Sequence, residues 1–322
     1  MLPPPVVRRL VFTPLLFLLT LLVVVLFPVA FAVTSLIGRD RRRALRLLWF
    51  ALAWGTRESS AVIECGWLWI RRRPRDDRHY DIIRRYVAGL YDAARRGLGL
   101  RVEISGGGDA GPGDRPLIVL SRHAGPGDAL LLVHHLLTDY RRRPRVVMKA
   151  QLQFDPCIDI AANRLPNVFV TPGGGAADDI GRLAAGLGPR DALLIFPEGG
   201  NFSPERRRRA IRRLTRLRRT GEATRAAAMR NLMPPRPGGV LAALDSAPHA
   251  DVVFVAHCGL DAMAAVGDIW RRIPLTGPVL AQWWRIPAED VPAGRDARVD
   301  WLYEQWERAD AWIGANREAV SG

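Results

Sequence analysis

The sequence is poor in the residues that build disulfide frameworks, metal centres and nucleotide-binding loops. It contains three cysteines, Cys65, Cys157 and Cys258, in 322 residues, and their spacing fits no metal or redox motif. This number argues against a disulfide framework and favours a reducing compartment. The sequence has neither a Walker loop nor a Gly-x-Gly-x-x-Gly motif after a predicted strand. We therefore expect no bound metal and no resident cofactor.

Lysine is almost absent. Lys149 is the only lysine among 47 basic residues, which exceed the 32 acidic ones and leave a net charge of +15. Such a charge requires an acidic partner, either phospholipid head groups or nucleic acid. A lone lysine in an arginine-rich chain indicates a position that needs a compact ammonium group. Chance retention at a solvated strand edge explains it equally well.

Charge is also absent from a long segment near the N-terminus. Leu10–Gly38 holds 29 residues without a charged side chain, which is roughly 43 Å as a helix. This length suits a membrane-embedded segment and exceeds the apolar part of a signal peptide. We therefore predict an N-terminal membrane-anchoring helical region over residues 1–70. Pro14 and Pro28 leave a tilted span and a re-entrant hairpin both open.

The flanks of this segment predict its orientation. Two basic residues, Arg8 and Arg9, precede the segment. More basic residues follow it, namely Arg39, Arg41, Arg42, Arg43 and Arg46. The heavier basic flank places the rest of the protein on the cytoplasmic side of the cell membrane. Leu47–Ile70 contains four tryptophans, which is typical of an interfacial or second membrane-dipping helix.

Short apolar runs alternate with helix-like segments over residues 71–322. This pattern predicts an α/β domain whose largely parallel sheet is flanked by helices. The predicted strands are Arg101–Ser105, Leu117–Leu120, Val146–Met148, Asn167–Val170, Ala192–Phe196 and Val252–Ala256. Trp301–Ile313 reads as an amphipathic helix that packs on this domain.

Residues 203–230 form a basic helical insertion in this domain. Ile211, Leu214 and Leu217 make a narrow apolar stripe on a strongly cationic helix that begins near Ser203. Anionic lipids, a nucleic-acid backbone and plain solvent all fit such a helix. Because no aromatic-rich strand pair accompanies it, nucleic acid is the least favoured partner.

The strongest chemical signal is Ser121–Asp128, Ser-Arg-His-Ala-Gly-Pro-Gly-Asp. An apolar strand precedes it and a helix-like run follows, so His123 lies at the strand end and Asp128 at the helix N-cap. Gly125–Gly127 allows the backbone to curl the carboxylate back onto the imidazole. An imidazole held in one tautomer by a carboxylate is a general base.

Two other His–Asp pairs have similar spacings. His134 and Asp139 lie in a predicted helix, where their side chains would point about 140° apart. His257 and Asp261 lack the glycine-rich turn. Spacing alone is thus weak evidence, and it is the turn that favours a catalytic function for the first pair over a structural loop.

A second polar loop follows another apolar run. Asp191–Ile195 leads into Phe196-Pro-Glu-Gly-Gly-Asn201. Since ligands bind outside the carboxyl ends of the strands in parallel α/β sheets, the two loops are expected to meet on one rim.

In this order the two motifs resemble those of the glycerolipid acyltransferases, which include the lysophosphatidic acid acyltransferases. The resemblance covers roughly residues 100–260 and extends to Asn231–Val240, which is similar to a Leu-Pro-Arg-x-x-Gly-Phe stretch in one branch. It implies transfer of a fatty acyl group from acyl-CoA, or an acyl carrier protein, to the hydroxyl of a lysophospholipid such as lysophosphatidic acid. The alternative is a non-catalytic, membrane-anchored lipid-binding protein derived from the same fold.

The sequence departs from this family where the acceptor binds. Arg122 precedes His123 where the family has Asn, and Gly200 and Asn201 stand where it has Thr-Arg. That family arginine binds the acceptor's phosphate, and Asn supplies no charge. The residues expected to bind substrate are therefore Lys149, Arg236 and Arg122 for phosphate, and the loop residues Phe196, Pro197, Glu198, Gly199, Gly200 and Asn201.

The resemblance also suggests a direct mechanism. His123 takes the proton from the acceptor hydroxyl, Asp128 stabilises the imidazolium, and the oxygen attacks the thioester without a covalent enzyme intermediate. Backbone N–H groups near Gly199 and Gly200, or in Gly125–Gly127, would stabilise the oxyanion. Glu198, with no reason in the sequence for a raised pKa, is expected to order its loop rather than to act as an acid.

Overall fold

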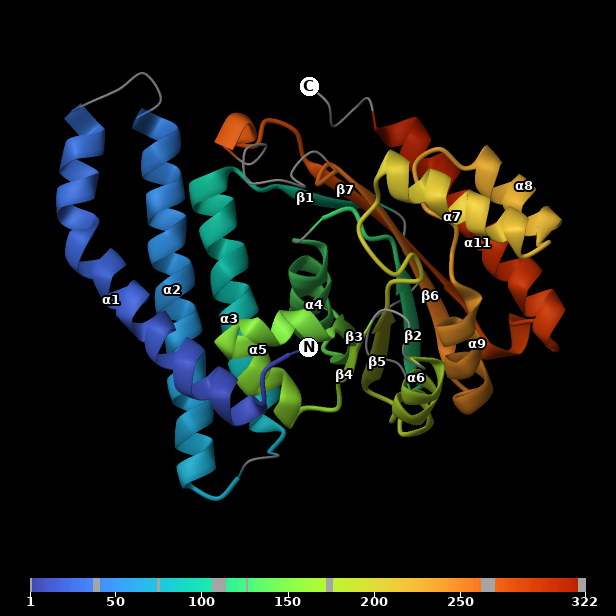
Figure 1. The fold of residues 1–322 in the computed structure, drawn as a ribbon, viewed down its shortest axis with the longest axis horizontal. Helices are drawn as coiled ribbons and strands as arrows, with labels where there is room; N and C mark the ends of the chain where they lie inside the picture. The colour runs from blue at the N-terminus through green and yellow to red at the C-terminus, as the bar shows by residue number, and fades with distance from the viewer. Residues whose placement is uncertain are drawn as a thin grey trace.

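Seven strands form one sheet in the order β1-β7-β6-β2-β5-β3-β4 (Figure 1). The computed structural model describes residues 2–36, 41–73, 76–105, 114–125, 127–171, 176–261 and 270–317. The strands are β1 Val102–Ser105, β2 Leu117–Ser121, β3 Arg143–Lys149, β4 Val168–Val170, β5 Asp191–Ile195, β6 Asp251–Cys258 and β7 Val279–Ile286. Strands β6, β2, β5, β3 and β4 are parallel neighbours, which confirms the largely parallel sheet.

The sequence analysis missed one strand, β7. It pairs antiparallel with β6, and β1 then pairs parallel with β7, so β1 and β7 run against the other five strands. The predicted strand Arg101–Ser105 exists but lies at the far edge of the sheet, and β7 and β6 separate it from β2.

Helices cover both faces of the sheet. The alternate residues Ile118 and Leu120 of β2 pack into one core with α6 Ala176–Ala185, α7 Pro204–Arg216, α8 Thr220–Ala228, α9 Pro237–Ser246 and α11 Arg295–Asn316. Leu117 and Val119 face the other way, toward α4 Asp128–Thr138. Trp306 of α11 is 1% exposed, so the C-terminal helix packs on the domain as predicted.

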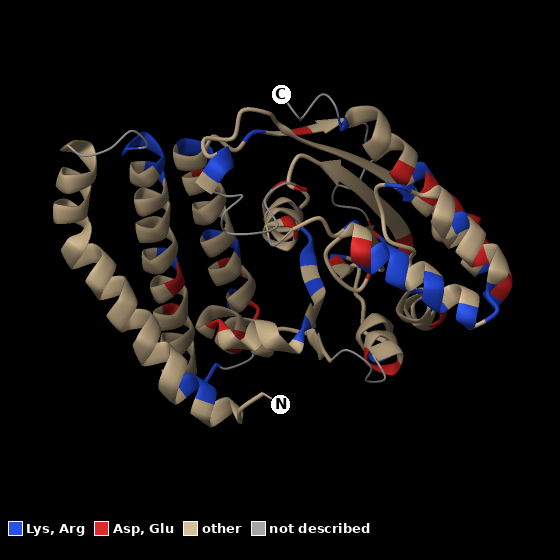
Figure 2. Ribbon diagram, turned by 45° about the horizontal axis from the view of Figure 1, so that its top comes forward, with Lys and Arg blue, Asp and Glu red and all other residues tan. Residues whose placement is uncertain are grey.

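The predicted basic insertion consists of two helices, α7 and α8, instead of one. Ser203 caps α7 by accepting a hydrogen bond from the Arg206 N–H, and Pro204 follows at the first turn, which fits the start expected near Ser203. Leu214 is buried, but Leu217 is 57% exposed because α7 ends at Arg216. The ribbon of α7 is blue over much of its length in Figure 2, where Lys and Arg are coloured blue.

A helical region flanks the domain at one end (Figure 1). Helix α1 Pro5–Leu36 lies beside α2 Arg41–Ile70, and α2 packs on α3 Arg78–Ala93 and α5 Pro156–Ala161. Arg8 and Arg9 of α1 form ion pairs of 2.6 and 2.9 Å with Asp159 of α5, whose side chain is buried. Further short helices lie at Ala94–Leu98, Ala150–Phe154, Ala162–Arg164 and Ala288–Asp290.

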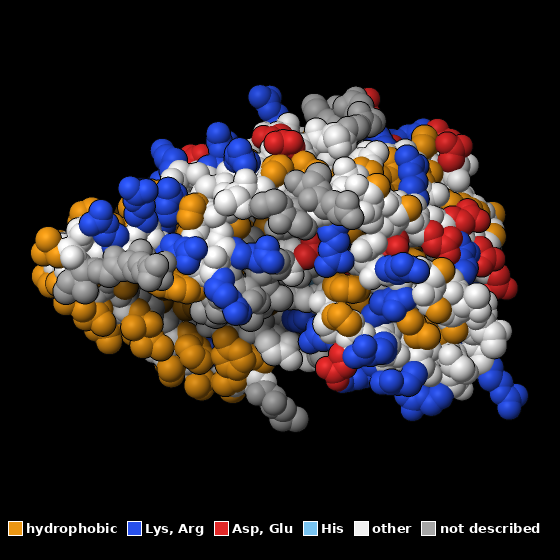
Figure 3. All heavy atoms as spheres, turned by 90° about the horizontal axis from the view of Figure 1, so that it is seen from above, with side chains coloured by type: hydrophobic (Ala, Val, Ile, Leu, Met, Phe, Trp, Pro, Cys, Tyr) orange, Lys and Arg blue, Asp and Glu red, His pale blue; other side chains and the backbone are white. Residues whose placement is uncertain are grey.

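Among the described residues, α1 is the one helix that is long and apolar enough to cross a membrane. Its apolar side chains are exposed along its length, and Figure 3 shows them as a continuous hydrophobic face at one end of the molecule. Pro14 and Pro28 lie within this helix.

Candidate active site

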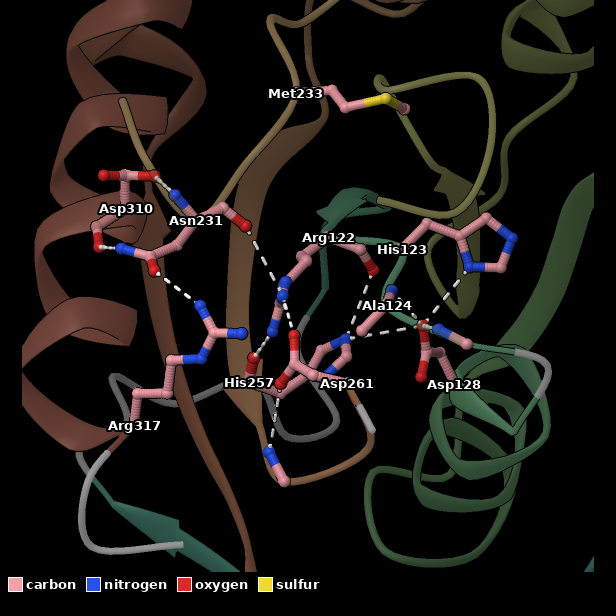
Figure 4. Close-up of polar contacts among 12 residues, drawn as sticks. Arg122, His123, Ala124, Asp128, Asn231, Met233, His257, Asp261, Asp310 and Arg317 are labelled. Carbon is pink, nitrogen blue, oxygen red and sulfur yellow. Dashed lines mark hydrogen bonds and ion pairs between the residues drawn. The ribbon is translucent and has the colours of Figure 1, made fainter. Parts of the chain in front are cut away.

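His123 and Asp128 form the pair that the sequence predicts. The Nδ1 atom of His123, just beyond β2, lies 3.2 Å from Oδ2 of Asp128. The same oxygen accepts hydrogen bonds from the N–H groups of Ala124 at 2.5 Å and Gly125 at 2.8 Å, so the loop curls around the carboxylate (Figure 4). Asp128 is the first residue of α4 and Gly127 is the N-cap, one residue earlier than predicted. The carboxylate therefore binds the preceding loop instead of capping the helix.

The imidazole of His123 is positioned for proton transfer. Its Nδ1 contact with Asp128 leaves Nε2 as the nitrogen that can receive a proton from a substrate. The side chain is 16% exposed, and the ring of Phe196 packs against it with 4.6 Å between centroids. The two motif loops thus meet at the imidazole.

Glu198 joins those two loops. Its Oε1 accepts a hydrogen bond from the His123 N–H at 2.8 Å, and Oε2 accepts one from the Met233 N–H at 3.0 Å. Glu198 is 1% exposed, and burial raises its pKa to about 7. The expectation of an ordering role agrees with these contacts. The raised pKa has its cause in the burial of Glu198, which the sequence alone does not show.

Arg122 does not bind an external phosphate, which corrects the sequence analysis. Its side chain is 1% exposed and forms an ion pair with Asp261. It also donates to the carbonyl oxygens of His257 at 2.6 Å and Asn231 at 3.4 Å (Figure 4). Since the guanidinium is buried and engaged, it holds the loops together. The His257–Asp261 pair belongs to this same network.

Three cationic side chains border Gly199 and Gly200. A Cβ atom on Gly199 would lie 2.9 Å from Nη1 of Arg236, and one on Gly200 would lie 3.0 Å from Nη1 of Arg206 and 3.5 Å from Nζ of Lys149. Gly199 and Gly200 have positive φ angles of 68° and 157°. Residues that carry a Cβ atom rarely adopt such angles. The absence of side chains at the Gly-Gly turn is what lets these cations approach the loop.

Counter-charges to these three cations are absent from the described residues. No carboxylate in the described part of the chain lies within ion-pair distance of Lys149, Arg206 or Arg236. Burial, and then Arg206 and Arg236, lower the pKa of Lys149. Burial, followed by Arg213 and Arg206, lowers that of Arg236. Mutual repulsion of this kind favours a bound anion such as phosphate.

The sequence analysis did not single out Arg206. It lies in a run of arginines on α7, and no sequence signal separates it from its neighbours. Its Nη1 donates to the carbonyl oxygen of Asn201 at 3.3 Å, while the Asn201 side chain itself adds no charge to the group.

A large apolar cavity reaches the loop that connects His123 to Asp128. Its volume is about 760 Å³, and its walls come mainly from α1, α2, α3 and α4 and include Gly125 and Gly127 of this loop. The walls derive from distant segments of the chain, so local sequence patterns could not reveal it.

The backbone donors proposed for an oxyanion are partly occupied. The N–H of Gly199 donates to the carbonyl of Phe196 at 3.0 Å, and that of Gly125 donates to Asp128. Within the described residues, the N–H groups of Gly127 and Gly200 have no such bond. Pro126 lies outside the described residues.

Residues 101–258, which contain both loops, match the family model described as Acyltransferase. These residues belong to the acyltransferase family. The chain is also similar to the crystal structure of the 1-acyl-sn-glycerophosphate (LPA) acyltransferase, PlsC, from Thermotoga maritima. The identity is 16%, the match covers 97% of this chain and 98% of that one, and the TM-score is 0.50. A comparison with curated proteins gives no match.

The acyltransferase fold explains why the site residues converge. The strands β2, β3 and β5 are parallel neighbours, so their carboxyl ends carry His123, Lys149 and the loop Phe196–Asn201 to one rim. Arg236 joins them because its backbone N–H donates to the Pro197 carbonyl at 2.9 Å. The side chains of Arg122 and Glu198, by contrast, are buried and bonded to other parts of the chain.

Proposed function

We propose that this acyltransferase moves a fatty acyl group from a thioester donor to the hydroxyl of a lysophospholipid such as lysophosphatidic acid. The observation that carries the proposal is the position of His123. His123 shares its loop with Gly125 and Gly127, which line the apolar cavity, and its imidazole packs on Phe196, which begins the loop that carries Gly199, Gly200 and their neighbouring cations. A substrate that has an apolar chain and a phosphate can place the chain in the cavity and the phosphate at the cations, with one general base available to both.

The reaction balances with His123 as the only proton carrier. Nε2 takes the proton from the acceptor hydroxyl as the oxygen attacks the thioester carbonyl. When the C–S bond breaks, the imidazolium returns the proton to the departing thiolate. Asp128 holds Nδ1 and stabilises the imidazolium. The N–H groups of Gly127 and Gly200 are candidates to stabilise the oxyanion.

The acceptor's phosphate is assigned to Lys149, Arg206 and Arg236. The family arginine is replaced by Asn201, and the Arg206 guanidinium, which reaches the Asn201 carbonyl from α7, supplies a charge at the same turn. Guanidinium and ammonium groups bind phosphate by charge-assisted hydrogen bonds.

The fatty acyl chain is assigned to the apolar cavity. About 760 Å³ lies in the range of ordinary ligand pockets, and the walls offer apolar side chains along four helices. Both acyl-CoA and an acyl carrier protein present such a chain as a thioester, and the choice between them is left to experiment.

The helical region is assigned to the cytoplasmic membrane surface. Arg8 and Arg9 tie the start of α1 to Asp159 in the α/β domain. Helix α2 runs back beside α1 and carries Arg57 and Glu64 in its length, and charges of this kind are costly in a bilayer core. We therefore favour an arrangement in which α1 inserts its exposed apolar face into one leaflet, and not one in which α1 crosses the whole bilayer.

A substrate panel tests this function. Purified protein in anionic lipid vesicles is incubated with labelled acyl-CoA or acyl carrier protein and with lysophosphatidic acid, other lysophospholipids or monoacylglycerol. Labelled diacyl phospholipid is the expected product, formed fastest from an acceptor with a free phosphate. If no acceptor is acylated by either donor although labelled fatty chains bind, the non-catalytic lipid-binding alternative replaces the proposal.

A further inference from the structure

A second groove lies in the helical region. It holds about 730 Å³, and its walls come from α1, α2, α5 and the short helix Ala162–Arg164. These walls share no residue with those of the apolar cavity at Gly125 and Gly127. The proposed acyl transfer therefore leaves this groove without a role.

Two arginines line the groove, and part of each guanidinium group is unbonded. Arg9 donates to the Asp159 carboxylate through Nε at 2.9 Å and to the Asp159 carbonyl through Nη2 at 3.3 Å. Arg164 donates to the Cys65 carbonyl through Nη1. Within the described residues, Nη1 of Arg9 and Nη2 of Arg164 make no hydrogen bond. Since the Arg9 side chain is 44% exposed and Arg164 is half-buried, both groups retain N–H donors for a ligand.

Positive charge exceeds negative charge around this groove. Arg8 and Arg9 share the single carboxylate of Asp159. Across the described part of the chain, no carboxylate lies within ion-pair distance of Arg164. Burial, and in addition the charge of Arg9, lower the pKa of Arg164. An anion bound by Arg9 and Arg164 would offset the repulsion between them.

The remaining walls of the groove are largely apolar. Ile63 and Trp69 of α2 are 60% and 63% exposed, and Leu10, which follows Arg9 in α1, is 71% exposed. The groove thus borders the exposed hydrophobic surface of the helical region (Figure 3). The other apolar wall residues are Phe17, Val62 and Ile160. A fitting ligand therefore combines an anionic group with an apolar chain.

We propose that this groove binds one anionic phospholipid from the leaflet that α1 enters. Its phosphate lies at Arg9 and Arg164, and an acyl chain packs on the apolar walls. A volume of about 730 Å³ is in the range of ordinary ligand pockets, and an indole at the rim suits the membrane interface. A free phosphate ion would leave the apolar walls in water, so the chemistry favours a lipid. The site depends on contact of α1 with a membrane and not on acyl transfer by His123.

Gly66 offers a way to fill the groove and keep the fold. It lies on α2 in the wall, and a Cβ atom there would meet no atom within 4 Å. Leu also favours a helix more than Gly does. Gly66→Leu therefore places a side chain in the space of the lipid. Gly221→Leu on α8 is the matched control, because a Cβ atom at Gly221 also meets no atom within 4 Å and Gly221 lies outside the groove.

Native mass spectrometry of the purified protein tests the site. The wild type in detergent micelles is given equal amounts of phosphatidylglycerol and phosphatidylcholine. We expect it to retain one phosphatidylglycerol with about tenfold preference, because the charge-assisted bonds need an anionic head group. Gly66→Leu should retain that lipid about tenfold less, and Gly221→Leu should match the wild type. Arg164→Gln should still bind lipid but lose the preference, which tests the site independently of the Gly66 variant.

Three results would overturn the inference. The first is equal retention of the two lipids by the wild type, and the second is undiminished retention by Gly66→Leu. The third is displacement of phosphatidylglycerol by an equal amount of glycerol phosphate, which would show a phosphate site without a place for the chain. His123→Ala should retain the lipid as the wild type does, so failure of the proposed acyl transfer would leave this site standing.

Discussion

Oε1 of Glu198 accepts a hydrogen bond from the backbone N–H of His123 at 2.8 Å. A buried carboxyl group in the loop after the neighbouring strand β5 thereby fixes the backbone of His123. Its other oxygen binds the Met233 N–H, so three chain segments depend on one side chain. The backbone position of the proposed base, His123, thus depends on a buried side chain from another loop.

The pH dependence of stability reports on this carboxyl group. The pKa of Glu198 rises from 4.5 to about 7 through burial, so between these values the native state holds a proton that the unfolded chain has lost. The free energy of unfolding must therefore fall as pH rises through this window, by up to about 1.4 kcal/mol per pH unit. Urea denaturation of wild type and Glu198→Gln across the window measures the contribution, and the variant should lose this part of the slope. Identical slopes would show that Glu198 is already ionised.

The cations at the Gly-Gly turn predict acceptor selectivity. Arg206→Gln and Lys149→Gln should each raise KM for lysophosphatidic acid by about tenfold to a hundredfold, because a charge-assisted bond to phosphate is lost. Acylation of an uncharged monoacylglycerol should change little. Arg209→Gln is the matched control, because Arg209 lies on the same helix but is 66% exposed and paired with Glu205. Equal KM values in Arg206→Gln and the control would remove Arg206 from the acceptor site.

The apolar cavity predicts acyl-chain preference. Leu47 lines it, whereas its neighbour Leu48, also half-buried, does not. Leu47→Trp should lower kcat/KM for long acyl donors by about tenfold and spare short ones, since the indole occupies space that the chain needs. Leu48→Trp serves as the control in the same chain-length series. A uniform loss across all chain lengths would place the acyl group elsewhere.

The exposed face of α1 predicts membrane binding. Leu18, Leu22 and Val25 are 62%, 49% and 61% exposed there. Replacing all three with Lys should weaken binding to lipid vesicles by at least about tenfold, because each buried apolar side chain contributes about 1.5–3 kcal/mol. Vesicle co-sedimentation measures this, with Ile104→Lys on β1 as the control. Unchanged binding of the triple variant would exclude this face as the anchor.

Local signals in the sequence predicted the contact between His123 and Asp128. His123 and Asp128 are five residues apart and meet through a tight turn that the sequence itself encodes. Six strands followed from apolar runs of the right length. The antiparallel strand β7 was missed, and its pairing with β6 sets the direction of β1 as well.

The sequence analysis failed for residues whose surroundings depend on contacts between distant segments of the chain. Arg122 reads as an accessible cation beside the base, yet Asp261, 139 residues away, holds it in the interior. Arg206 is one of many arginines until the fold places it at Gly200. Burial of Glu198 likewise arises only when the loops pack together. Such properties belong to tertiary structure, which residue patterns do not report.

The most direct test of the account is the activity of His123→Ala beside His249→Ala, whose histidine is exposed and lies outside the site. Both proteins are assayed with labelled acyl donor and the best acceptor of the panel, after circular dichroism has shown that they are folded. The account predicts a loss of about 10³-fold in kcat for His123→Ala and none for the control. Turnover of His123→Ala close to that of the wild type would contradict it.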